Sequence, residues 1–477
     1  MSNAQYEVTI GLEVHVQLST KSKIWCSCAV KTMAQVNSTV CPVCLAMPGS
    51  LPVLNRAVVE KAVLASLALN FQLNYQSFFD RKNYFYPDLP KGYQITQFFT
   101  PIAEKGFLEL ELEEGEKKKI SLERLQIEED TGKSQHASTG SLINLNRAGT
   151  PLIEIVSAPE IKSAQEAALY FKTLCDTLTF LGVTEGNLQE GNLRCDANVS
   201  LAEVGSKKLG TRREIKNLNS FRNVEKAIES EIKLQTEILS QGGKVKQQTL
   251  GFDANTLTIK VLREKGESSD YRYFPEPDVL PILLTEDDVS ALKKKMVELP
   301  SEKRERYKSD FELSQYDASV LTQSKELALY FEEVMSLYKG KAKNAANWIM
   351  VELLRFLNEA NCSPKNSPIS PANLAELLLL IDSKVISGKM AKDVFEKMYD
   401  EKKSAKALVD ELGLSQITSE EAIGKLIDEV IQKSPQQLSD YRNGKDRLFG
   451  FFVGQVMKLS QGKANPDLVN KILKEKL

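Results

Sequence analysis

The chain has 477 residues, of which 42% are apolar and 26% charged, a composition typical of a globular protein large enough for two or three domains. The 62 Lys and Arg nearly balance the 64 Asp and Glu, and this net charge of -2 excludes a global basic field for nucleic acid. No apolar stretch approaches the ~20 residues of a membrane span, and the first residues lack the basic and apolar regions of a secretory signal. These features predict a cytoplasmic protein with no membrane partner.

Short period-two runs separated by Gly, Pro and Asn turns predict strands at residues 7–18, 106–112, 142–146 and 151–156. Apolar residues at three-to-four spacing predict helices at residues 55–69, 164–181 and 219–239. The two kinds of element mix without regular alternation, which favours an α+β fold with an antiparallel sheet. The sequence contains neither a GxGxxG nor a GxxxxGK[ST] motif, so a Rossmann or P-loop nucleotide site is excluded.

The prolines of residues 270–281 prevent a helix there, and this segment is expected to close the first domain. From residue 286 onward, Lys/Glu/Leu-rich helical segments follow one another. The predicted organisation is a mixed domain at 1–293, an all-helical domain at 294–405 and a small helical tail at 406–477. From residue 430 on, nine Lys and Arg against four Asp and Glu give a local charge of +5. Such a patch suits a phosphate backbone, and the alternative is a solvated helical surface.

Four of the seven cysteines fall within 19 residues, as Cys26-Ser-Cys28 and Cys41-Pro-Val-Cys44. Two close thiolate pairs can supply four ligands to one tetrahedral Zn²⁺, and such a closed site would be structural. The odd number of cysteines argues against a disulfide framework. The alternative is four unligated cysteines in a reducing compartment.

A second group of candidates consists of carboxylates on apolar strands. Residues 11–17 are expected to form a strand with Glu13, His15 and Gln17 on one face. Three acidic residues at 128–130 follow a strand-like run, and Glu154 interrupts the apolar strand at 151–156. Buried carboxylates are costly unless they are paired or bound to a cation, and hard oxygen ligands with one imidazole suit Mg²⁺ or Mn²⁺. The alternative for the Glu-x-His pattern is a surface strand or a hydrogen-bonded core histidine.

Three further segments are rich in polar groups. Residues 80–88 are dense in polar groups and aromatics with no amphipathic period, and a structured, hydrogen-bonded loop is their alternative reading. Residues 193–200 and 212–219 alternate as strands, and an ordinary half-exposed strand is the alternative reading of both. Their polar faces are expected to carry Arg194, Asp196 and Asn198 in the first strand, and Glu214 and Lys216 in the second.

Together, several long motifs in this order resemble the GatB family, the B subunits of bacterial tRNA-dependent amidotransferases. The motifs lie at residues 10–18, 80–87, 128–130, 145–147, 149–156, 193–198, 270–281 and 450–457. The resemblance implies a heterotrimer in which the partners are an amidase, the A subunit, and a small C subunit. With ATP and Mg²⁺, the B subunit is expected to phosphorylate the side-chain carboxylate of Glu-tRNA(Gln) or Asp-tRNA(Asn). Ammonia from the amidase then yields Gln-tRNA(Gln) or Asn-tRNA(Asn).

The resemblance also assigns roles to individual residues. The implied Mg²⁺ ligands are His15, Glu129 and Glu154, with Glu13 beside them. Lys82 and Asp196 match positions where ammonia is expected to reach the catalytic pocket, and the implied cofactor-binding neighbours are Arg194, Glu214 and Lys216. The zinc motif is complete at Cys26, Cys28, Cys41 and Cys44. The implied fold is a cradle domain with an antiparallel sheet, followed by a helical domain and a tail that hold the tRNA.

Two alternative functions account for parts of the sequence. A non-catalytic zinc-containing tRNA-binding adaptor would explain the cysteines and the basic tail, but it gives the strand-borne carboxylates no purpose. A glutaminase is disfavoured because the sequence lacks a Gly/Ser-rich amidase signature and a recognisable nucleophilic cysteine paired with a histidine.

Overall fold

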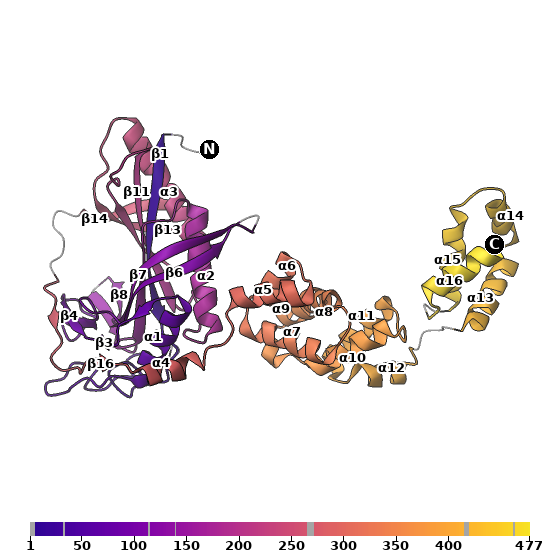
Figure 1. Ribbon diagram of the computed structural model, residues 1–477, viewed down its shortest axis with the longest axis horizontal. Coiled ribbons are helices and arrows are strands. Elements are labelled where there is room, and N and C mark those ends of the chain that lie inside the picture. The colour runs from indigo at the N-terminus through magenta and orange to yellow at the C-terminus, as the bar shows by residue number, and fades with distance from the viewer. Residues whose placement is uncertain are drawn as a thin grey trace. The chain divides into compact units, whose positions relative to one another are not determined.

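The computed structural model describes residues 5–31, 34–112, 115–138, 140–264, 271–414, 419–460 and 463–477. The chain divides into two compact units, Met1–Pro300 and Ser301–Leu477. The first unit contains a large sheet with helices, and the second is built of helices (Figure 1). The predicted α+β class, with a mainly antiparallel sheet followed by helices, is therefore confirmed. In the part of the chain described, no helix is both long and apolar enough to cross a membrane.

The main sheet of the first unit has nine described strands in the order β14-β13-β12-β11-β1-β10-β7-β6-β2. Their bounds are Tyr6–Gln17 (β1), Gln72–Leu73 (β2), Ala103–Glu111 (β6), Lys117–Glu129 (β7), Pro151–Ser157 (β10), Leu193–Glu203 (β11), Arg213–Leu218 (β12), Gln248–Asp253 (β13) and Thr258–Glu264 (β14). Strand β1 lies at the centre of this order, between β10 and β11, and Figure 1 shows it beside β11. The described pairings are antiparallel except that of β12 with β13, which are parallel.

Three helices pack on the apolar face of this sheet: α1 (Arg56–Ala68), α2 (Ala164–Phe180) and α3 (Phe221–Ser240). Each begins at a residue whose side chain accepts a hydrogen bond from the first turn, namely Asn55, Ser163 and Ser220. Such caps satisfy backbone N–H groups that have no partner within the helix. The sequence pattern predicted all three helices to within two residues at either end.

The opposite face of the main sheet is partly covered by smaller elements. A three-stranded sheet joins β15 (Phe274–Pro275), β4 (Asp80–Asn83) and β5 (Tyr93–Thr96), and β5 contacts β7. Two antiparallel pairs complete the small elements of this unit: β3 (Gln76–Ser77) with the distant β16 (Ile282–Leu283), and the hairpin of β8 (Lys133–Ala137) and β9 (Gly140–Asn144). A structured loop, the alternative reading of residues 80–88, does not hold for the first four residues, which pair as β4 because β5 and β15 supply partners that no local pattern reveals.

The helix α4 (Glu286–Lys293) closes the first unit, with Leu292 buried in its core. The second unit contains two separate hydrophobic cores. Elements of the first of these cores are α5 (Pro300–Phe311), α6 (Gln315–Leu321), α7 (Lys325–Leu337), α8 (Ala342–Asn347), η2 (Trp348–Leu353), α9 (Leu354–Glu359), η3 (Pro364–Asn366), α10 (Pro371–Asp382), α11 (Gly388–Glu401) and α12 (Ala405–Leu412).

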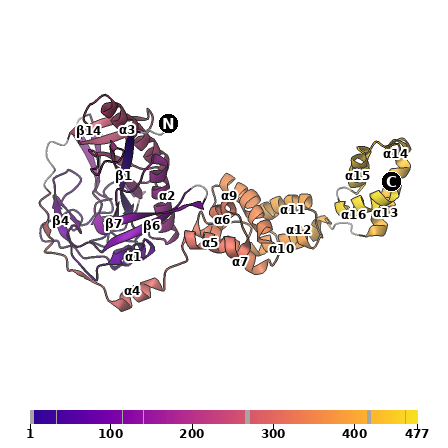
Figure 2. The ribbon, with the colours of Figure 1, turned by 45° about the horizontal axis from the view of Figure 1, so that its top comes forward.

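The second of these cores lies among α13 (Glu420–Lys433), α14 (Pro435–Arg442), α15 (Leu448–Leu459) and α16 (Pro466–Lys476), which form a small bundle of their own (Figure 2). Helix α12 contributes Ala405, Leu408 and Val409 to the first core rather than to this bundle. The first helical core thus includes residues up to Val409, whereas the sequence analysis places the start of the tail at residue 406.

The segment that follows β14 is fastened to β4 by a buried ion pair. Arg81 donates to both carboxylate oxygens of Glu276, at 2.8 and 2.9 Å, and to Asp278 at 2.9 Å. The side chain of Glu276 is 0% exposed, so it depends on this partner for its charge. The Arg81 guanidinium also lies 4.2 Å from the centre of the Tyr93 ring. These contacts hold the proline-rich segment against the strand that carries Lys82.

We therefore expect Arg81→Ala to destabilise the first unit by about 3 kcal/mol, because it leaves Glu276 buried without its cation. The measurement is urea unfolding followed by Trp25 fluorescence in a Trp348→Phe background. Arg56→Ala is the matched control, since it breaks the exposed pair with Glu60, whose N–O distance is 2.9 Å, and should cost less than about 0.5 kcal/mol. Equal losses in the two variants would contradict a stabilising role for the buried pair.

Candidate active site on the polar face of the sheet

Strand alternation gives the main sheet one apolar and one polar face. In β1, Leu12, Val14 and Val16 are buried in the core, while Glu13 and His15 take the other side. The same alternation operates in the neighbouring strands, whose registers align the polar positions. It places on the polar face Glu13, His15 and Gln17 of β1, Glu154 of β10, Gln126 and Glu128 of β7, Arg194, Asp196 and Asn198 of β11, and Glu214 and Lys216 of β12.

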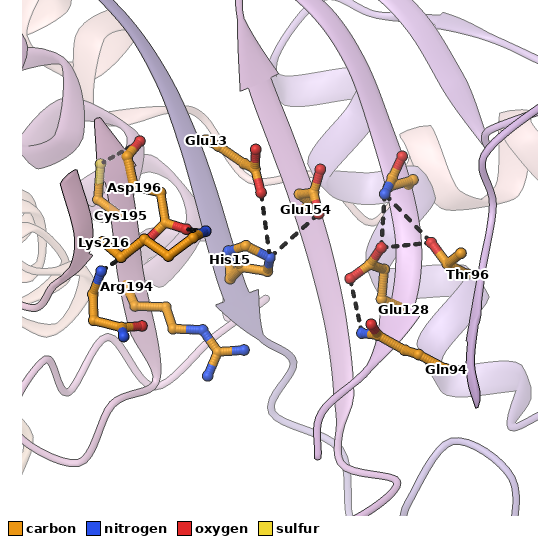
Figure 3. Close-up of polar contacts among 12 residues, drawn as sticks. Glu13, His15, Gln94, Thr96, Glu128, Glu154, Arg194, Cys195, Asp196 and Lys216 are labelled. Atoms are coloured by element: carbon orange, nitrogen blue, oxygen red, sulfur yellow. Dashed lines mark hydrogen bonds and ion pairs between the residues drawn. The ribbon is translucent and has the colours of Figure 1, made fainter. Parts of the chain in front are cut away.

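Three of these side chains converge at the centre of the face. The Nε2 atom of His15 lies 3.3 Å from Glu154 Oε2 and 3.8 Å from Glu13 Oε1 (Figure 3). The three ligand atoms lie within 4.8 Å of one another. An octahedral Mg²⁺ with bonds of about 2.0–2.1 Å separates neighbouring ligand atoms by roughly 3 Å and opposite ones by roughly 4 Å. The spacing of this group therefore fits a divalent cation with oxygen and imidazole ligands.

The electrostatics of the group reflect its burial. Burial, together with the charge of Glu154, raises the pKa of Glu13 to about 7. Burial alone would also raise the pKa of Glu154, but the hydrogen bond and charge of His15, with Lys82 and Arg124, lower it to about 2. In addition, His15 Nδ1 is buried and has no hydrogen-bond partner among the described residues. The group thus holds two carboxylates of very different basicity beside one imidazole.

The two adjacent glutamates at the end of β7 point to opposite faces. Glu128 lies on the polar face, next to Glu154 (Figure 3), and it accepts hydrogen bonds from Thr96 Oγ1 at 2.5 Å and Gln94 Nε2 at 3.1 Å. Gln126, two residues earlier on the same face, also donates to it at 2.7 Å. Its carboxylate is fixed by neutral donors, and no cation is hydrogen-bonded or ion-paired to it in the described chain.

Glu129 is on the other side of the strand. Lys91 donates to both of its carboxylate oxygens, and the backbone N–H of Ile95 donates to Oε1 at 2.9 Å. The ligand set inferred from the sequence requires Glu129 to lie beside His15 and Glu154. The structure does not bring it there. The reason is the period of two: Leu125 and Ile127 are core residues, and Glu129 continues their face. Glu128, not Glu129, is therefore the glutamate that the end of β7 contributes to the polar face.

The β11 and β12 side of the face is lined by paired charges. Asp196 accepts from Lys216 Nζ at 2.7 Å and from the backbone N–H of Asn217 at 2.8 Å. Lys216 also lies 2.9 Å from Glu214, and Arg194 Nη2 donates to Asp130 at 3.1 Å. The four predicted residues Arg194, Asp196, Glu214 and Lys216 thus lie on the same face as His15.

Lys82 approaches the face from β4. Its ammonium lies 5.1 Å from the centre of the Tyr271 ring. Burial by itself lowers the pKa of Lys82, but the negative charges of Glu128 and Glu154 raise it above its ordinary value. The lysine is therefore a fixed cation that faces these two carboxylates. Sequence reasoning missed Gln94, Thr96 and Gln126, although the alternation of Gln126 and Glu128 with Leu125 and Ile127 was a usable signal.

The four clustered cysteines form a second candidate metal site. The sulfur atoms of Cys26, Cys28, Cys41 and Cys44 all lie within 4.8 Å of one another. Those of Cys41 and Cys44 are 3.9 Å apart, close to the roughly 3.8 Å that tetrahedral Zn–S bonds of about 2.3 Å require. A hydrogen bond from Cys26 lowers the pKa of Cys44 to about 4, helped by the backbone N–H of Cys41 and the charge of Lys23. One thiol is thus prepared to ionise, as a zinc ligand must.

Comparison with known proteins shows the same two parts. Residues 8–290 match the family described as GatB/GatE catalytic domain, and residues 329–477 match the GatB domain. The chain is 51% identical over 478 residues to the B subunit of the aspartyl/glutamyl-tRNA(Asn/Gln) amidotransferase of Geobacter sp. (strain M21), covering 99% of both chains. It is 52% identical over 476 residues to the protein of that name in Thermodesulfovibrio yellowstonii, covering 99% of this chain and 100% of the relative. The chain therefore belongs to the GatB family of tRNA-dependent amidotransferase subunits.

Proposed function

We propose that this chain activates the side-chain carboxylate of Glu-tRNA(Gln), Asp-tRNA(Asn) or both by ATP-dependent phosphorylation. A carboxylate oxygen attacks the γ-phosphorus and ADP leaves. Ammonia then attacks the acyl carbon of the resulting acyl phosphate, the C–O bond to phosphate breaks, and the amide forms with loss of a proton. The observation that carries the proposal is the convergence of His15, Glu13 and Glu154 at the centre of the polar face, with Glu128 of β7 on the same face. The class of enzyme is a carbon–nitrogen ligase.

In this proposal Glu13, His15, Glu154 and Glu128 hold Mg²⁺, with Glu128 in place of Glu129. The cation would shield the anionic substrate from the phosphates of ATP. Their different basicities support this role, because a strongly acidic Glu154 stays ionised and available to the metal. The neutral donors on Glu128 orient its carboxylate without neutralising it. Lys82 lies close enough to these carboxylates to balance charge that builds up during phosphoryl transfer.

The remaining polar residues are assigned either to ATP binding or to the delivery of ammonia. Arg194 and Lys216, with Glu214 positioning Lys216 at 2.9 Å, are proposed to bind the phosphates of ATP. Asp196 is held in place by Lys216 and the N–H of Asn217, and its carboxylate is proposed to bind incoming ammonium. Lys82 lies with it on the proposed route of ammonia. The four cysteines are proposed to hold a structural Zn²⁺.

The ammonia source lies outside this chain in the proposal. An amidase, the A subunit, would release ammonia from glutamine, and a small C subunit would complete a heterotrimer. The substrate is a misacylated tRNA, so the reaction takes place in the cytoplasm. The relatives' name, which denotes a B subunit, supports a complex of several chains.

The decisive experiment follows transfer of labelled γ-phosphate from ATP, using assembled complex, Glu-tRNA(Gln) and no ammonia donor. Accumulation of an alkali-labile acyl phosphate that is lost in His15→Ala would support the proposal. If tRNA binds but no label is transferred, the second candidate, a zinc-containing tRNA-binding adaptor, is favoured instead. The observations that favour this adaptor are the four-cysteine cluster and the basic tail.

The tail bundle is proposed to bind the tRNA backbone, and the structure sorts its basic residues into two kinds. Lys433 lies 2.6 Å from Glu429, one turn earlier on the same helix. Arg447 and Lys458, at opposite ends of α15, are exposed and have no ion-pair partner in the described residues. Charges without a partner are the ones free to neutralise phosphates.

We expect the double change Arg447→Ala and Lys458→Ala to weaken tRNA binding roughly tenfold and to reduce the slope of log affinity against log salt by about 2. The measurement is a salt series of filter-binding titrations with the assembled complex. Lys433→Ala is the control and should change affinity less than about twofold, because Glu429 already neutralises that lysine. Identical salt slopes in the wild type and the double variant would contradict the assignment.

A further inference from the structure

Lys23 is a buried lysine to which the reaction assigns no role. The whole residue is 0% exposed, and it is among the largest fully buried side chains of the chain. Its ammonium donates one long hydrogen bond, 3.4 Å to the carbonyl of Leu145. Within the described residues no carboxylate lies within ion-pair distance of it. A buried ammonium without a counter-charge is strongly unfavourable, so a negative group is needed nearby.

The cysteine cluster is the negative group that the fold brings to this lysine. Lys23, Cys26 and Cys44 line one cavity of about 190 Å³. A Cβ atom placed on Gly149 would lie 3.7 Å from Lys23 Cδ, 3.9 Å from Cys44 Cβ and 4.0 Å from Glu129 Oε2, so these three side chains border the same glycine. The backbone N–H of Lys23 also donates to the carbonyl of Cys28 at 2.9 Å. This backbone hydrogen bond holds Lys23 within the loop that carries Cys26 and Cys28.

The other acidic groups around this cavity already have cations. Glu129 is paired with Lys91, which donates to both of its oxygens, and Asp278 accepts from Arg81 at 2.9 Å. Neither carboxylate therefore needs Lys23 to balance its charge. In contrast, four thiolates around one Zn²⁺ carry a formal charge of 2−, and no other lysine, arginine or histidine lines this cavity besides Lys91 among the described residues.

We propose that Lys23 is the counter-ion of the four-cysteine zinc site. Its ammonium offsets part of the negative charge of the zinc–thiolate centre, and the centre in turn compensates the buried ammonium. The inference rests on the proposed zinc site and extends it to a residue that is not a ligand. Groups that support metal ligands without touching the metal typically contribute 10- to 100-fold to metal affinity.

The test measures zinc affinity of the full-length chain by competition with a chromophoric chelator. Lys23→Met removes the charge and should weaken zinc binding roughly 10- to 100-fold. Lys23→Gln removes the charge but keeps a polar end one atom shorter than that of lysine, and it should show a similar loss. Lys21→Met is the matched control, because Lys21 is exposed and lies two residues earlier on the same loop. It should stay within about twofold of the wild type.

A spectroscopic measurement separates charge from packing. In Co²⁺-substituted protein, the thiolate-to-cobalt charge-transfer band should move to lower energy in Lys23→Gln, because the thiolates lose a nearby cation and become more electron-rich. Lys23→Arg keeps the charge and should restore both the band and most of the affinity. Unchanged zinc affinity and band position in folded Lys23→Gln would overturn the proposal. If the wild-type chain itself binds no zinc, the zinc site fails first and this inference fails with it.

Discussion

In the assembled enzyme, Glu128→Gln is expected to lower formation of the acyl phosphate by a factor on the order of 100, while glutamine hydrolysis by the amidase partner stays normal. The substitution keeps the shape of the side chain but removes a negative charge that we assign to the metal. It also leaves the hydrogen bonds from Thr96 and Gln94 with only one acceptor oxygen in place of two. The measurement is single-turnover transfer of labelled γ-phosphate to Glu-tRNA(Gln).

The same strand provides the control. Glu123→Gln changes an exposed glutamate of β7 by the same single group, and it should leave phosphate transfer within about twofold of the wild type. Glu129→Gln is the informative comparison, because it tests the neighbouring carboxylate that pairs with Lys91. If Glu129→Gln abolished the metal dependence of the reaction and Glu128→Gln did not, the assignment of Glu128 would be wrong.

Loss of zinc is expected to destabilise the first unit on the order of 5 kcal/mol, because a structural zinc site contributes its binding energy to folding. At roughly 2 °C per kcal/mol for a unit of this size, the melting temperature should fall by about 10 °C. Cys41→Ser removes one ligand and should release the metal as well as lower the melting temperature. Scanning calorimetry with measurement of bound zinc by mass spectrometry tests both.

Cys362→Ser is the matched control for this change. Cys362 is partly exposed in the second unit, and its thiol donates to backbone carbonyls of Ser363 and Asn366, at 3.5 and 3.4 Å. The same substitution there should keep one zinc per chain and shift the melting temperature by no more than about 2 °C. A zinc-free Cys41→Ser protein with an unchanged first-unit transition would show that the cluster stabilises nothing.

The strands and helices around the site were predictable because alternation and helical spacing are local. The pattern of β1 placed Glu13 and His15 on one face, and the structure shows them there, opposite Leu12 and Val14. The helices α1, α2 and α3 carry capping residues that mark their starts. Such signals need no knowledge of distant parts of the chain.

The rest of the site depends on long-range pairing. The choice between Glu128 and Glu129 is a question of which face each side chain takes, and a shift by one residue reverses it. The hydrogen bonds from Gln94 and Thr96 arise because β5 lies against β7, a contact that no local pattern predicts. Similarly, Lys23 stands in a plain polar stretch, and its burial depends on distant residues such as Leu145 and Gly149 that lie beside it in the fold.

The central place of β1 in the sheet has a consequence for biosynthesis. Its two neighbours, β10 and β11, begin at Pro151 and Leu193, so the first strand made must wait for nearly 200 residues before both of its edges are paired. At the usual 5–20 residues per second, this is a delay on the order of 10–40 s. Ile10, Leu12, Val14 and Val16, all buried in the finished sheet, stay exposed on the nascent chain during that time. A chaperone at the ribosome that covers this N-terminal strand would shield these apolar side chains until both partner strands have been made.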